Sequence, residues 1–118
     1  MDELTRVLDA WKKGIDAHRP GDVAALFAED AIFQGLHPYS VGRAGVAAYY
    51  DSQPLGMTVD YHIVREKRLA GDVRLGWVEA DFHFDSRHGG DGREPVEVNL
   101  TVVLAGGLIG HYHVSRRV

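Results

Sequence analysis

The feature that most constrains the fold is the stretch from residue 10 to residue 33, which reads as a helix, a break, a second short helix and a strand. The break is Pro20-Gly21, which ends the first helix and leaves Asp22 placed to cap the next one. Along the first helix, apolar residues recur at helical spacing and form a single stripe: Leu4, Val7, Leu8, Trp11 and Ile15. A helix with one apolar stripe needs a partner surface, so the rest of the chain must supply one.

That surface is predicted in the second half of the chain, where long strand-like runs replace the helices. A short strand at Ala31–Gln34 and a third helix within residues 42–51 come first, and Pro54 and Gly56 close that helix. Four strands then follow, separated by turn residues: Thr58–Leu69, Val73–Asp85, Pro95–Ala105 and Leu108–Arg116. These spacings are typical of an antiparallel meander. The order of elements therefore predicts an α+β fold, with three N-terminal helices packed on a mostly antiparallel sheet.

The one glycine-rich segment is Ser86–Arg93, between the second and third of these strands. It lacks the spacing and the strand-to-helix context of a phosphate-binding loop, so we expect a mobile hairpin loop.

Composition excludes several classes of function. With 118 residues, the chain fits a single domain covering residues 1–118. Its formal net charge of −4 gives no basic footprint for nucleic acid, and its zero cysteines exclude disulfides, thiolate catalysis and cysteine-ligated metals. No apolar run approaches the roughly 20 residues of a membrane-spanning helix, and residues 1–6 lack the features of a signal peptide. We expect a cytoplasmic protein that binds neither nucleic acid nor membrane.

Three segments carry a resemblance to a known superfamily: residues 22–31, Gly42-Arg43 before the third helix, and His111–Ser115 in the last strand. With the order of elements, they resemble the NTF2-like superfamily of cone-shaped α+β domains over nearly the whole chain. They look most like its SnoaL-like branch, in particular the small bacterial proteins of the enediyne-pathway SgcJ/EcaC type. The last strand is also similar to the association domain of calmodulin-dependent kinase II. Such relatives usually carry a tryptophan where Gly107 stands here.

The resemblance implies a curved sheet wrapped around the long helix, a pocket at the open end of the cone, and frequent dimerisation. It implies no single reaction, because the superfamily includes isomerases, cyclases, dehydratases, hydrolases and noncatalytic binding or assembly modules.

Side chains alternate across a strand, so each long strand divides into two faces. One face is purely apolar, as in Val78, Ala80, Phe82 and Phe84 on one strand and Val96, Val98, Leu100, Val102 and Leu104 on the next. The other face is mixed, and in the last strand Ile109, His111, His113 and Ser115 are expected to share it, opposite Tyr112 and Val114. If the mixed faces lie on one side of the sheet, they bring together a titratable cluster: Glu79, Asp81, His83, Asn99, Thr101, His111 and His113.

Two arrangements of the sheet fit this pattern. In one, the apolar face packs on the helices and the mixed face is a solvated outer surface, which a monomer can tolerate. In the other, the mixed face with Trp77, Val103 and Ile109 lines the cone, and the apolar face is buried against a second subunit. We expect the second arrangement and a homodimer, because NTF2-like domains often pair through the outer sheet face and keep polar groups in the pocket.

In that arrangement His111 is the first candidate for general acid or base, because an imidazole exchanges a proton near neutral pH. Asp81 or Glu79 would orient it, or would itself be the base if desolvation raised its pKa. The other candidate ligand-binding residues are polar or aromatic side chains on the mixed face and tyrosines that can donate to a substrate oxygen: Trp77, Asn99, His113, His83, Tyr39, Tyr50 and Tyr61. For each tyrosine, simple packing of the ring is the commoner role.

His111-x-His113, with His83 or Glu79 as a third ligand, is a possible metal site, but two histidines on one strand have no diagnostic spacing. We therefore expect neither a metal nor a cofactor. The predicted function is a cofactor-independent acid–base enzyme that moves a proton next to a carbonyl in a small, apolar, polyketide-like molecule. The alternatives are a noncatalytic ligand-binding or assembly module, and a structural dimer whose pocket is filled by its own side chains.

Overall fold

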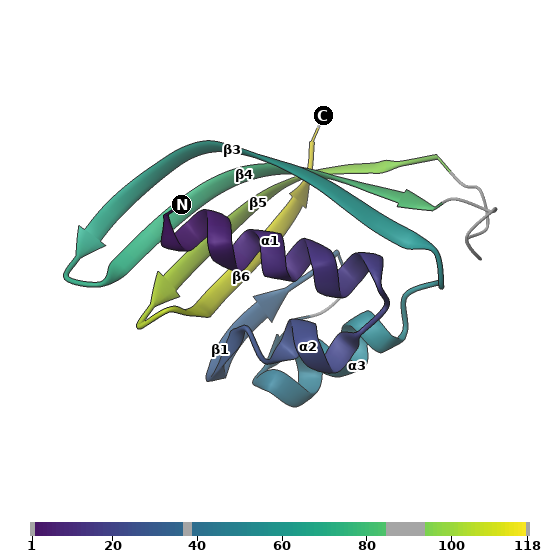
Figure 1. Ribbon diagram of the computed structural model, residues 1–118, viewed down its shortest axis with the longest axis horizontal. Coiled ribbons are helices and arrows are strands. Elements are labelled where there is room, and N and C mark those ends of the chain that lie inside the picture. Colours follow the sequence, from purple (N-terminus) through teal and green to yellow (C-terminus); the bar gives the residue numbers. More distant parts are fainter. Residues whose placement is uncertain (1, 37–38, 85–93, 118) are drawn as a thin grey trace.

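The computed structural model describes residues 2–36, 39–84 and 94–117, and the predicted loop Ser86–Arg93 lies outside them. The helices are α1 (Glu3–Asp16), α2 (Pro20–Ala24) and α3 (Arg43–Asp51). The strands are β1 (Phe27–Gln34), β2 (Ser40–Val41), β3 (Met57–Ala70), β4 (Val73–Phe84), β5 (Val96–Ala105) and β6 (Leu108–Arg116). They form one curved, open sheet in the order β2-β1-β6-β5-β4-β3, antiparallel except between β1 and β6, and the helices lie on one side of it (Figure 1). The predicted α+β fold is confirmed.

The long helix α1 crosses the concave side of the sheet (Figure 1). Asp2 caps it, because its carboxylate accepts a hydrogen bond of 2.8 Å from the backbone N–H of Thr5. The predicted stripe is its buried face: Leu4, Val7, Leu8, Trp11 and Ile15 are each at most 5% exposed. The helix approaches β4 at Gly76, where an added Cβ would lie 2.7 Å from a methyl carbon of Leu4.

The second helix begins differently from the prediction. Arg19 is its N-cap, Pro20 is its first residue, and Asp22 lies inside the first turn and makes no cap hydrogen bond. The prediction that Asp22 caps this helix is wrong because proline is favoured at the first helical position, where its missing N–H has no intrahelical partner anyway.

The turn between β5 and β6 is a two-residue hairpin made by Gly106 and Gly107, with φ angles of 60° and 81°. Tight hairpins with the twist of the sheet favour positive φ at both central positions, and glycine adopts it without steric cost. Gly107 therefore belongs to this turn, which explains why a tryptophan is absent here.

The apolar face of the sheet packs on the helices, and Val78, Ala80, Val98, Leu100 and Val102 are fully buried there. Trp77, on the mixed face, is 45% exposed. The expectation that the mixed face lines the cone is therefore wrong, and the first of the two arrangements is the observed one. The physical reason is that the stripe of α1 requires an apolar surface, which β4 and β5 offer on one face only.

One residue of the last strand lies on a different face from the predicted one. His111 pairs with Val103 but Ile109 pairs with Leu104, so Gly110 is an extra residue in β6 and forms a β-bulge. Ile109 is consequently buried in the core, whereas His111 and His113 stay on the outer face.

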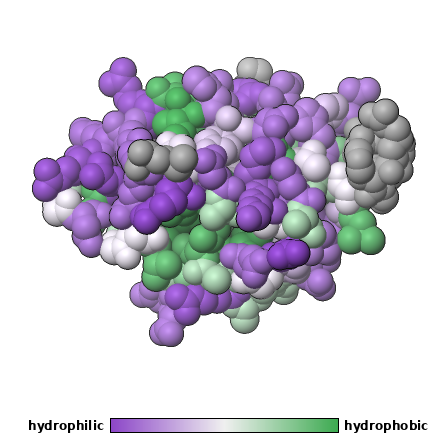
Figure 2. Space-filling view, viewed as in Figure 1, coloured by the Kyte–Doolittle hydropathy of each residue, from purple (hydrophilic) through white to green (hydrophobic). Residues whose placement is uncertain are grey.

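Polar residues cover most of the side shown in Figure 2, and hydrophobic residues gather mainly in its lower half, near β1. Within the part of the chain that the structure describes, no helix is long and apolar enough to cross a membrane.

Candidate ligand-binding site

A cavity of about 480 Å³ opens between α3 and the ends of strands β3 to β6. Its wall is mostly apolar and aromatic: Leu36, Tyr49, Gln53, Met57, Phe82, Phe84, Val96, Val98, Tyr112, Val114 and Arg116. Both its size and its lining are in the range typical of small-molecule sites.

Strand alternation builds the wall of this cavity. Phe82 and Phe84 on β4, Val96 and Val98 on β5, and Tyr112, Val114 and Arg116 on β6 are each two residues apart, so they lie on the face that packs on the helices. These strands extend the apolar face of the sheet to the pocket, where Tyr49 of α3 and Gln53, just past the end of that helix, form the opposite wall.

A chain of buried hydrogen bonds leads to the pocket. The indole N–H of Trp11 donates to the Tyr50 hydroxyl at 3.1 Å, and that hydroxyl donates to the Tyr112 hydroxyl at 3.2 Å. An indole nitrogen only donates, so the Tyr50 oxygen is occupied as an acceptor and its proton goes to Tyr112. The proton of Tyr112 then has no acceptor within the described part of the chain, and Tyr112 lines the cavity.

Burial keeps these phenols neutral. It raises the pKa of both Tyr50 and Tyr112 above the ordinary value, since a phenolate would be separated from water. Tyr112 is therefore a hydrogen-bond donor at physiological pH rather than a base.

Arg116 is the one residue with a formal charge among the described residues that line the cavity. Neither a carboxylate nor an imidazole is present in that set. The chemistry of the described wall is thus an apolar surface, a phenol donor, the Gln53 amide and a guanidinium at the rim.

The structure places the predicted titratable residues on one face of the sheet, but it is the outer face, and they are spread along it. His111 is level with Leu75 of β4, so the strand register separates it from Glu79 and Asp81. Glu79 pairs with Asn99, and Thr101 pairs with both Trp77 and His113. The His111 and His113 rings lie 6.3 Å apart. A catalytic role for His111, Asp81 or Glu79 stays a prediction, and these residues would act on an open surface, on the side of the sheet away from the cavity.

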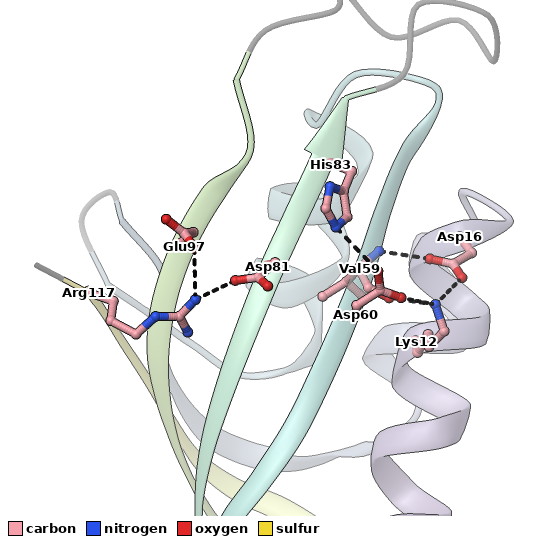
Figure 3. Close-up of polar contacts among 8 residues, drawn as sticks. All are labelled: Lys12, Asp16, Val59, Asp60, Asp81, His83, Glu97 and Arg117. Carbon is pink, nitrogen blue, oxygen red and sulfur yellow. Dashed lines mark hydrogen bonds and ion pairs between the residues drawn. The ribbon is translucent and has the colours of Figure 1, made fainter.

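Two of these side chains contact charged groups (Figure 3). Arg117 lies 2.5 Å from a carboxylate oxygen of Asp81 and 3.3 Å from one of Glu97. His83 lies 3.2 Å from the Asp60 carboxylate, which in turn lies 3.3 Å from the Lys12 amine. Asp81 is thus engaged by Arg117 and does not orient His111. The described residues contain no group of three or more His, Asp or Glu side chains placed to hold a metal ion.

The three candidate tyrosines lie in three different environments. Tyr50 is in the buried chain behind the pocket, Tyr61 donates a hydrogen bond to Asp9 on α1, and Tyr39 is 65% exposed. The pocket residues that sequence reasoning missed as site residues are Tyr112, Tyr49, Gln53 and Arg116. The available signal was the two-residue spacing of Tyr112, Val114 and Arg116, which places Arg116 on the same face as Tyr112.

A long helix packed on a curved β-sheet, with a mostly apolar cavity at one end, defines a cone-shaped α+β domain with a pocket. Neither a protein-family model nor a curated protein matches the sequence. Three similar solved structures are a ketosteroid isomerase-like protein from Erwinia carotovora atroseptica, a cystatin-like domain of unknown function from Nostoc punctiforme, and a protein assigned as a calcium/calmodulin dependent protein kinase II association domain from Xanthomonas campestris.

The agreement with these structures is extensive in shape and weak in sequence. The Erwinia protein has a TM-score of 0.78 at 16% identity, with 97% of this chain and 93% of that chain covered. The Nostoc domain has a TM-score of 0.82 at 15% identity, with 98% of this chain and 75% of that chain covered. The Xanthomonas protein has a TM-score of 0.77 at 17% identity, with 98% of this chain and 86% of that chain covered. The expected NTF2-like fold is confirmed. At these identities the similarity concerns the fold.

Proposed function

We propose that the protein binds a small, largely apolar molecule in the cavity between α3 and β3–β6, and that Tyr112 donates a hydrogen bond to an oxygen of that ligand. The observation that carries this proposal is the buried chain from Trp11 through Tyr50, which leaves the Tyr112 proton available at the cavity wall. A donor held by two buried aromatic groups is preorganised, so little entropy is lost when it meets a ligand.

We favour the noncatalytic alternative over the acid–base enzyme. Proton transfer next to a carbonyl, as in ketosteroid isomerases, uses a carboxylate base together with a tyrosine donor. This chain offers the donor, but a base must come within hydrogen-bond reach of the substrate, and the described wall contains no carboxylate or imidazole. The name of the Erwinia protein raises the enzymatic alternative without supplying the missing base.

The test uses benzophenone, whose ketone oxygen is its only polar atom, and diphenylmethane, which has the same shape without that oxygen. We expect the wild type to bind the ketone more tightly and Tyr112→Phe to lose that preference, by about fivefold for one neutral hydrogen bond. Titration calorimetry measures both ligands, and Tyr39→Phe is the matched control because Tyr39 is exposed and away from the cavity. An unchanged preference in Tyr112→Phe would contradict the assignment, as would absence of binding to either compound.

A separate measurement tests the enzymatic alternative. Acetophenone has exchangeable hydrogens next to its carbonyl, and NMR in deuterated water detects their loss. Binding with exchange no faster than in buffer is the expected result. Protein-dependent exchange that Tyr112→Phe abolishes would instead establish proton transfer in this pocket.

We also propose that two copies associate through the outer face of the sheet, although it is not the apolar face that the sequence pattern led us to expect there. The support is a set of exposed apolar residues: Val41 pairs with Ile32 across strands, and these residues are 59% and 46% exposed. Trp77, 45% exposed, lies on the same face.

Charge on this face is also separated in a way that suits a second copy. One end carries four carboxylates, Asp60, Glu79, Asp81 and Glu97. They outnumber the two cations paired with them, Lys12 and Arg117. Arg65 and Lys67, which pair with Trp77 and Leu75 across β3 and β4, make the other end basic. A two-fold axis near Trp77 would bring the acidic end of one copy onto the basic end of the other.

A further inference from the structure

Two consecutive arginines at the end of β6 lie on opposite faces of the sheet. Arg117 reaches the outer face, where it contacts Asp81 and Glu97 (Figure 3). It also donates to the Val98 carbonyl oxygen at 2.9 Å. Arg116 is on the face of Tyr112 and pairs with the fully buried Val98, so it belongs to the rim of the cavity.

The two arginines also differ in the partners of their side chains. Arg117 is neutralised by two carboxylates, whereas the Arg116 guanidinium makes no hydrogen bond or ion pair with any other described residue. The rest of the described cavity wall is uncharged. A guanidinium beside a low-dielectric wall, with no counter-ion from that wall, gives the mouth of the cavity a positive potential. A guanidinium also binds carboxylates through two parallel hydrogen bonds, which adds direction to the attraction.

The separation of the two polar groups sets the shape of a matching ligand. Tyr112 and Arg116 are four residues apart on one strand, which places their Cα atoms roughly 13 Å apart. Val114 lies between them on the same strand, and Val98, which pairs with Arg116, continues the apolar wall on β5. Beyond Arg116 the wall extends to Val96 and Phe84. Along β6 the cavity wall thus runs from a donor through an apolar residue to a cation, with further apolar surface on β4 and β5 beside the cation.

Resting on the proposed function, we propose that the ligand is an amphipathic carboxylic acid, with its carboxylate at Arg116, an apolar body along β4–β6 and an acceptor oxygen at Tyr112. A purely neutral ligand would leave the guanidinium without a role in recognition, with its aliphatic stem merely covering apolar surface. The charge of the ligand is therefore the property that separates these two interpretations.

The experiment extends the benzophenone test by one group. Para-benzoylbenzoate keeps the ketone and adds a carboxylate, and para-benzoylbenzamide is its neutral counterpart of nearly the same shape. Calorimetry measures the dissociation constants of both with the wild type, Arg116→Gln and Arg6→Gln. Arg6 is the matched control because its loss changes the net charge equally, and it is an exposed residue of α1 outside the cavity.

We expect the wild type and Arg6→Gln to prefer the carboxylate by about fivefold, as for an ion pair that stays partly in water, and Arg116→Gln to bind both compounds alike. Added salt should reduce the preference, because it screens the pair. Equal affinity for the two compounds in the wild type would overturn the carboxylate proposal while leaving the neutral binding site in place. If neither these compounds nor benzophenone binds, the proposed function fails first. A preference that survives in Arg116→Gln would assign the charge recognition to another group and overturn the role of Arg116.

Discussion

At the scale of single residues, Tyr50 joins the packing of the core to the chemistry of the pocket. It accepts from Trp11, donates to Tyr112, and is only 3% exposed. Its ring also packs against Phe33 and Tyr49, at centroid distances of 5.7 Å and 5.1 Å. The hydroxyl therefore has a stabilising role as well as the proposed orienting one.

The stabilising role predicts the effect of Tyr50→Phe. The substitution keeps the ring but removes the acceptor of the buried Trp11 N–H, and an unpaired buried donor costs about 1–3 kcal/mol. We expect a loss of that size in the free energy of unfolding, measured with urea. In the double variant Trp11→Phe/Tyr50→Phe the two losses should not add, because the unpaired donor is gone. Simple additivity would show that the hydrogen bond contributes little.

At the scale of elements, α1 provides hydrogen-bond partners for backbone groups at the open edge of the sheet. β3 is an edge strand, and the backbone N–H of Val59 donates to the Asp16 carboxylate at 2.9 Å. The Val59 carbonyl accepts from the Lys12 amine at 2.6 Å, and Lys12 and Asp16 lie 2.9 Å apart (Figure 3). One helical turn thus occupies both backbone groups that an unpaired edge residue exposes.

This contact predicts a local effect of Asp16→Ala. The Val59 N–H loses its acceptor, so we expect its amide to exchange hydrogen faster and the protein to be destabilised by about 1 kcal/mol. Exchange followed by NMR gives the first quantity and urea unfolding the second. Asp51→Ala, an exposed aspartate at the end of α3, is the control. Unchanged protection of the Val59 amide would show that solvent replaces Asp16 freely.

At the scale of the whole molecule, the sequence predicted the elements and their order but not which face of the sheet is inside. Two-residue alternation separates Val98 from Asn99 without saying which one meets α1. The stripe of α1 decides this, because it needs an apolar surface, and the resemblance to pocket proteins favoured the wrong side. The bulge at Gly110 places Ile109 on the face opposite to the one that a strict two-residue period predicts.

The residues of the pocket could not be predicted from the sequence for a related reason. Tyr112 and Val114 have the alternation of ordinary core residues, and only the third residue of that series, Arg116, differs in polarity. Whether these positions face a helix or a cavity depends on how α1 and α3 lie on the sheet, which strand periodicity does not contain. The charged residue at the end of this apolar series, Arg116, was therefore the one sequence feature that could have indicated the pocket.

The proposed association of two copies makes the last prediction, since it concerns the whole outer face. Trp77→Glu adds a charge beside Thr101 and Arg65, at the place where the two copies would meet. The substitution removes the apolar indole from the contact and adds a carboxylate whose burial costs desolvation energy. We therefore expect a dimer in the wild type and a monomer in the variant, measured by light scattering over a dilution series. Leu55→Glu is the control because Leu55 is 60% exposed but precedes β3, away from the outer face. A monomeric wild type at every concentration would contradict the association but not the pocket, because the described cavity wall belongs to a single chain.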